Sequence, residues 1–203
     1  LTPNGISNIP DAPADLVERD EVVFGFLGRL EPQKGLFDLL NAWAAVCQAS
    51  PNKKLILRIG GEGSQQQEVE SRIRELQLTD SVELVGFIAK PIEFMADLDV
   101  FVLPSYAEGN SNSVLEAMVA GRPVISTDVG GTAMLLGDAC APYVLEPGDV
   151  PSLVSAMQCF IVNPELKAEV GRHNWERVSS KFSIKAARVR YEETYRKLLK
   201  LTD

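Results

Sequence analysis

The chain has 203 residues, of which 45% are hydrophobic and 24% are charged. This is the composition of a soluble globular protein with room for one well-buried domain or a tight pair of small ones. The formal net charge of −8 disfavours a general nucleic-acid binder, and no apolar run approaches the roughly 20 residues of a membrane span. One histidine and three scattered cysteines leave little material for a histidine-rich metal site, a Ser-His-Asp triad or a disulfide framework.

Residues 1–20 are rich in Pro, Asn and Asp and predict a linker that runs into a domain. From residue 22 onward, short apolar runs alternate with segments of helical periodicity. The expected strands are 22–27, 54–59, 81–86, 99–104, 122–127 and 142–146. Helices are expected after each of the first four strands, the clearest being the stripe Leu36, Leu39, Leu40, Trp43, Val46 and Cys47.

Alternating strands and helices with near-continuous apolar strands indicate a parallel sheet covered on both faces. We therefore predict an α/β fold with a Rossmann-like, doubly wound parallel sheet of about six strands over residues 21–148. Residues 149–203 read as helices that pack on this domain, with starts at Asp149, Pro164 and Ser183.

Ligands of an open parallel sheet bind beyond the carboxyl ends of its strands, and the segments expected there all carry glycine. They are GRLEPQKG (28–35), GGEGS (60–64), GFIAKP (86–91), SYAEGNSNS (105–113) and DVGGT (128–132). Neither the dinucleotide fingerprint G-x-G-x-x-G nor the P-loop pattern is complete. Arg29 and Lys34 in the first loop would suit a diphosphate, although solvated surface charge is the simpler interpretation of an isolated pair.

Two glutamates, Glu108 and Glu116, stand eight residues apart. On one continuous helix they would lie about 12 Å apart. This is too far for a shared proton and longer than the separation of about 5–5.5 Å between the carboxylates of a retaining hydrolase. Ser113 and Glu116 fit a capping box, S-x-x-E, at a helix start near Ser113. Carboxylates repel phosphate but accept hydrogen bonds from sugar hydroxyls, so the pattern favours a ligand with a central diphosphate and sugars at both ends, a nucleotide-sugar.

These residues resemble a known family. EGNSNSVLEAM followed by GRPVISTDVGG is similar to the E-x7-E region of retaining GT-B glycosyltransferases, specifically glycosyltransferase family 4. GRLEPQKG resembles the family's arginine–lysine loop, GGEG its second glycine turn and SVELVGFI its base-recognition strand. NGI at 4–6 resembles the start of the family's C-terminal domain, and YEETYRKLL its closing helix.

The resemblance implies roles for residues at matching positions. Arg29, Lys34 and Glu108 would be the catalytic set, with the two cations on the donor diphosphate and Glu108 on the transferred sugar. Glu116 would hold the ribose hydroxyls, while Phe87 and Ile88 would flank the base. The donor-binding residues implied in full are Gly28, Gly61, Gly63, Phe87, Ile88, Gly109, Asn110, Ser111, Asn112, Val114 and Glu116.

The resemblance further implies a metal-independent, retaining hexosyltransferase that uses a nucleoside-diphosphate sugar, with UDP-sugars favoured, and needs no cofactor. A GT-B enzyme has two Rossmann-like domains, and this chain corresponds to the C-terminal, donor-binding one. The acceptor-binding N-terminal domain is absent, so we expect the 203 residues alone to be inactive or weakly active.

The acceptor would be a growing polysaccharide or glycolipid, and the protein cytoplasmic, with any peripheral membrane contact made by the absent domain. Two alternatives stay open: a nucleotide-sugar 2-epimerase of related fold, and a non-catalytic nucleotide-sugar-binding module. Turnover of UDP-N-acetylglucosamine without an acceptor would mark the epimerase.

Overall fold

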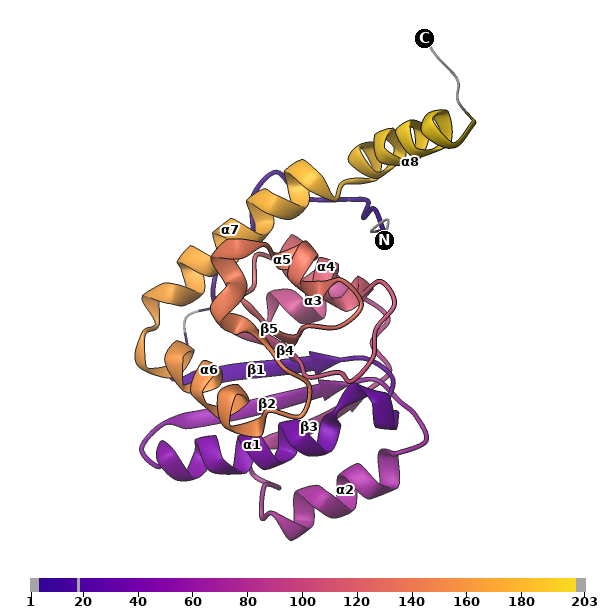
Figure 1. The fold of residues 1–203 in the computed structure, drawn as a ribbon. Helices are drawn as coiled ribbons and strands as arrows, with labels where there is room; N and C mark the ends of the chain where they lie inside the picture. The colour runs from indigo at the N-terminus through magenta and orange to yellow at the C-terminus, as the bar shows by residue number, and fades with distance from the viewer. Residues whose placement is uncertain (1–3, 18, 200–203) are drawn as a thin grey trace.

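The computed structural model describes residues 4–17 and 19–199, and its centre is one parallel sheet of six strands (Figure 1). The strands are β1 (Glu21–Leu27), β2 (Lys54–Gly60), β3 (Val82–Gly86), β4 (Val100–Leu103), β5 (Val124–Thr127) and β6 (Val144–Leu145). Their order is β3-β2-β1-β4-β5-β6, the doubly wound arrangement of nucleotide-binding folds, in which the winding reverses between β1 and β4. The predicted fold class is confirmed.

Helices cover both faces of the sheet (Figure 1). One face carries α1 (Leu36–Ala49), α2 (Gln66–Glu75) and α6 (Val150–Val162). The other carries α3 (Pro91–Ala96), α4 (Asn112–Val119), α5 (Thr132–Leu136) and α7 (Glu165–Lys181). Short 3-10 turns occupy η1 (Pro32–Lys34) and η2 (Asp138–Tyr143), and α8 (Ile184–Leu199) projects away from the domain.

Burial on both faces explains the apolar character of the central strands. All four residues of β4 are buried, and the apolar stripe of α1 lies against the sheet, where Trp43 meets Phe24 edge-on with 5.5 Å between ring centroids. Burying a large apolar side chain contributes roughly 1.5–3 kcal/mol. The sheet and its covering helices therefore form a rigid platform for the loops at the strand ends.

The last two strands are shorter than predicted. Pro142 lacks an N–H group and cannot donate to a strand ladder; it lies inside η2, and β6 begins only after Tyr143. Pro123 likewise precedes β5. Arg122, expected in the strand, is instead fully buried, and its Nη2 donates to the carbonyl oxygens of Ala14, Asp15 and Ala96. Helix α5 has only five residues and no predicted counterpart.

Residues 4–17 run along the domain. Besides the contacts of Arg122, the backbone of Ile6 pairs with Phe182 and Ile184, at 2.9 and 3.0 Å, where α7 gives way to α8. The amide of Asn4 donates to Asn112 Oδ1 at 2.9 Å, so this segment touches the start of α4. The three predicted C-terminal helix starts are confirmed: Asp149 and Pro164 are the N-caps of α6 and α7, and α8 follows Ser183.

Candidate functional site

The loops that follow β1, β2 and β4 meet at the carboxyl edge of the sheet, beside the switch between β1 and β4. Backbone hydrogen bonds join the first two loops, from Gly28 N to Gly60 O at 3.1 Å and from Leu30 N to Glu62 O at 3.0 Å. Another joins the first and fourth-strand loops, from Tyr106 N to Gln33 O at 2.8 Å. Three of the five predicted loops are therefore neighbours in space.

Gly35 allows the loops after β1 and β4 to approach each other closely. Its φ is +67°, a left-handed conformation that a side chain disfavours, and a Cβ there would lie 2.0 Å from the carbonyl oxygen of Pro104. The end of the first loop is thus fixed against the start of the loop after β4. Gly35 is the last residue of the predicted loop 28–35, but no role was predicted for it. Its close approach to Pro104 could not be inferred from the sequence.

Lys34 and Glu108 form an ion pair at this junction. The Lys34 ammonium donates to Glu108 Oε1 at 2.6 Å, and the two side chains are only 13% and 8% exposed. Ser105 Oγ donates to the same oxygen, also at 2.6 Å. The family resemblance implies that Lys34 binds the diphosphate and Glu108 the sugar. Neither their direct contact nor a role for Ser105 was predicted.

Arg29 is the second cation on the loop after β1. It is exposed, and its guanidinium has no hydrogen-bond partner among the residues that the structure describes. It is therefore able to turn toward an anion without first breaking a hydrogen bond.

The start of α4 differs from the prediction. Its N-cap is Ser111, in an extended conformation, and Ser111 Oγ accepts from the Val114 N–H at 3.4 Å. Ser113 lies inside the first turn, where its hydroxyl meets that of Ser111 at 3.2 Å. The predicted capping box from Ser113 to Glu116 is wrong, because the N-cap is Ser111, two residues earlier, and the helix begins at Asn112.

Glu116 is left without a structural partner by this arrangement. It shares the solvent-facing side of α4 with Asn112 and Ser113, whereas the other side chains of the helix are buried. Across residues 4–17 and 19–199 no group hydrogen-bonds its carboxylate, and burial raises the pKa of the Glu116 carboxyl. A half-buried carboxylate with free acceptor capacity suits a ligand hydroxyl.

The remaining predicted residues fall into two groups. Gly28, Gly61 and Gly63 line the contact between the first two loops, and Phe87, 75% exposed, and Ile88 follow β3 at the same edge. Gly109 and Asn110 lie in the loop before α4, where a Cβ on Gly109 would meet no atom within 4 Å. The Val114 side chain is fully buried, so only its backbone could face a ligand.

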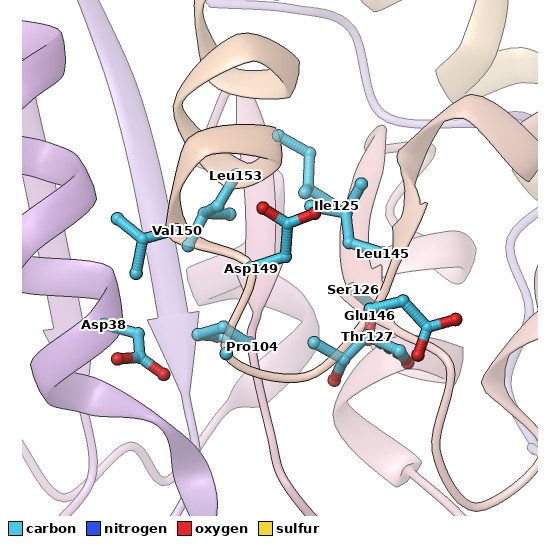
Figure 2. A pocket seen from close by; sticks show the side chains of 11 residues that line it. Asp38, Pro104, Ile125, Ser126, Thr127, Leu145, Glu146, Asp149, Val150 and Leu153 are labelled. Carbon is cyan, nitrogen blue, oxygen red and sulfur yellow. Dashed lines mark hydrogen bonds between the residues drawn. The ribbon is translucent and has the colours of Figure 1, made fainter.

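A small recess lies nearby, between α1, the ends of β4 and β5, and the loop before α6 (Figure 2). Its volume of about 10 Å³ admits about one water molecule. The carboxylates of Asp38, Glu146 and Asp149 line it (Figure 2), and Asp38 accepts a hydrogen bond from Tyr106. Its size and negative charge make it unsuited to a nucleotide phosphate.

No group of three or more His, Cys, Asp or Glu side chains among the described residues could hold a metal ion. None of the helices in the described ranges is both long and apolar enough to span a bilayer.

A doubly wound sheet with glycine-rich loops, cations and carboxylates gathered at its switch point places the chain in the class of α/β domains that bind ligands at that edge. Within this class, residues 21–163 match the family described as Glycosyl transferases group 1. The chain belongs to this family.

Its relatives are named glycosyltransferases. The capsular polysaccharide biosynthesis glycosyltransferase CapM of Staphylococcus aureus is 28% identical over 181 residues, which make up 89% of this chain and 47% of the relative. A 2-deoxystreptamine N-acetyl-D-glucosaminyltransferase of Niallia circulans is 28% identical over 77% of this chain and 40% of its own length. The chain thus spans less than half the length of these relatives.

Solved structures share the fold. An Anabaena protein, HepE, in complex with UDP and glucose, matches with a TM-score of 0.77 and 25% identity over 87% of this chain and 48% of its own. A sucrose-phosphate synthase from Thermosynechococcus elongatus matches with a TM-score of 0.76 and 27% identity over 90% of this chain and 47% of its own. The domain is of the GT-B type.

Proposed function

We propose that the chain is the donor-binding domain of a retaining glycosyltransferase that moves a hexosyl group from a nucleoside-diphosphate sugar to an acceptor. The observation that carries the proposal is the meeting of Lys34 and Glu108 at the switch point of the sheet, 2.6 Å apart, with Arg29 on the same loop. The UDP and glucose bound to the Anabaena relative favour a UDP-sugar as donor.

The charges of the site residues suggest where each part of the donor would bind. The diphosphate would lie toward Arg29, Lys34 and the backbone N–H groups of the glycine-rich loops. Glu116, a carboxylate with free acceptors, would hold the ribose hydroxyls, and Glu108 would accept from a hydroxyl of the transferred sugar. Phe87 and Ile88 would flank the base at the end of β3.

The proposed reaction needs no metal. The acceptor oxygen forms its bond to the anomeric carbon on the face that the leaving group departs, so configuration is retained. The bond from that carbon to the diphosphate breaks, its electron pair stays with the diphosphate, and a phosphate oxygen takes the acceptor's proton. Arg29 and Lys34 would stabilise the negative charge that develops on the leaving group.

The acceptor is assigned to sequence outside these residues. Since the chain spans less than half of CapM, we propose that an N-terminal domain supplies acceptor binding and any membrane contact. A polysaccharide or glycolipid acceptor is suggested by the name of CapM. By itself the chain would bind donor and transfer sugar weakly or not at all.

The test is calorimetric titration of UDP, GDP and ADP into the chain and into Arg29→Ala, Lys34→Ala and Glu116→Ala. Arg74→Ala, which removes an exposed cation of α2, is the control. We expect one nucleotide to bind and the three site variants to bind it about tenfold or more weakly, with the control unchanged. Absence of binding at millimolar concentration, or equal affinities in all variants, would overturn the proposal.

Full-length protein then separates the two alternatives. Turnover of UDP-N-acetylglucosamine to its epimer without acceptor would identify an epimerase. Donor binding with no transfer to any acceptor would identify a non-catalytic module.

A further inference from the structure

The two carboxylate oxygens of Glu108 differ in the number of hydrogen bonds that they accept. Oε1 accepts two hydrogen bonds, one from Lys34 and one from Ser105. Oε2 has no donor in the described part of the chain. Because a carboxylate has about four acceptor sites, Oε2 can accept from a ligand hydroxyl while Oε1 stays in place.

The pair also sets the local charge. Lys34 and Glu108 neutralise each other at 2.6 Å in a largely buried setting, where charges are screened less than at the surface. A diphosphate that approaches Lys34 meets a cation already paired with a carboxylate, and that carboxylate repels it.

Burial and a backbone hydrogen bond hold Ser105 in place. It is fully buried, and its carbonyl oxygen accepts from Thr127 Oγ1 at 2.5 Å. Its hydroxyl is therefore fixed by the ends of β4 and β5, and it keeps Glu108 Oε1 directed at Lys34.

We propose that Glu108, positioned by Ser105, competes with the diphosphate for Lys34, so that the site discriminates against the free nucleoside diphosphate and in favour of the nucleotide-sugar. The sugar supplies a hydroxyl for Oε2, which offsets the repulsion. The free diphosphate has no such group, and it is the product that must leave. This inference rests on the proposed function, and it makes Ser105 a positioning residue.

The experiment compares the dissociation constants of UDP and UDP-glucose for the chain, Glu108→Gln and Ser105→Ala. We expect Glu108→Gln to bind UDP about three- to thirtyfold more tightly, since Lys34 is then released from its carboxylate partner and is free to pair with the diphosphate. Ser105→Ala should change UDP affinity in the same direction by a smaller factor, about two- to tenfold. UDP-glucose should gain less in both variants, so the ratio of the two constants shifts, which a loss of stability alone would not produce.

Two controls isolate the ion pair. Glu146→Gln removes a carboxylate at the same edge of the sheet, after β6 and thus two strands from β4, and should leave UDP affinity nearly unchanged. In a Lys34→Met background, Glu108→Gln should lose most of its effect on UDP.

Unchanged or weaker UDP binding in Glu108→Gln would overturn the inference while leaving the proposed function intact, provided that the unsubstituted chain binds UDP. Should Glu108→Gln fail to fold, Ser105→Ala decides in the same way. If the unsubstituted chain binds no nucleotide, the proposed function fails and the inference fails with it.

Discussion

A Cβ atom on Gly61 would lie 1.9 Å from the carbonyl oxygen of Gly28, so the loops that follow β1 and β2 touch backbone to backbone. The φ of Gly61 is +124°, a conformation essentially restricted to glycine. This contact keeps the loop of Arg29 and Lys34 in register with the second glycine loop.

Gly61→Ala is expected to lower the free energy of unfolding by about 2–4 kcal/mol, because the added methyl group meets backbone that cannot move aside and the φ is strained. Urea denaturation measures the change. Gly109→Ala is the matched control, since no atom lies within 4 Å of its Cβ position; it should change stability by less than about 1 kcal/mol. Equal effects at the two positions would contradict the close packing of the loops.

Ser111→Ala should destabilise the domain by about 1 kcal/mol, because it removes the N-cap of α4. Ser113→Ala should cost less, since Ser113 lies within the helix and caps nothing. Thermal denaturation of the two variants side by side gives the comparison. A larger loss of stability in Ser113→Ala than in Ser111→Ala would contradict the assignment of Ser111 as the N-cap and support the capping box predicted from the sequence.

The fold was predictable because its signals are local. The stripe that includes Leu36 and Leu40 repeats with helical period, and the run 99–104 is apolar without interruption, so α1 and β4 followed from pattern alone. The misses were local conflicts. Prolines at 123 and 142 made β5 and β6 shorter than predicted. The N-cap of α4 is Ser111 and not Ser113, although both are serines at the start of the helix.

The site was predictable as a set of loops but not as a set of contacts. Glycine-rich segments after parallel strands had to converge on one edge, and they do. The ion pair joins residues 74 positions apart, and no pattern in either loop indicates it. The roles of Ser105 and Gly35 depend on the same long-range packing, which only the folded chain shows.

Glu116→Gln should raise the melting temperature by about 1–3 °C at pH 7.5. Burial raises the pKa of the Glu116 carboxyl in the folded state, so its contribution to stability is fully present below the unfolded pKa of about 4.3 and is lost as the pH rises through the folded pKa. The amide does not ionise and avoids that loss. The advantage of the variant should therefore vanish near pH 3.5.

Melting curves of the variant and the unsubstituted chain at pH 3.5, 5.5 and 7.5 measure this difference. Glu193→Gln, at an exposed position of α8, is the control and should show little change at any pH. An advantage for Glu116→Gln that is constant from pH 3.5 to 7.5 would exclude ionisation as its cause. The same variant should bind UDP more weakly, since the amide is a poorer acceptor for ribose hydroxyls.

Hydrogen exchange with and without saturating UDP tests most directly whether the donor site lies at the switch between β1 and β4. We predict slower exchange on UDP binding in residues 28–35, 60–64 and 105–114, with residues 145–150 around the small recess unaffected. Protection confined to the recess, with no change in residues 28–35, would contradict the central claim.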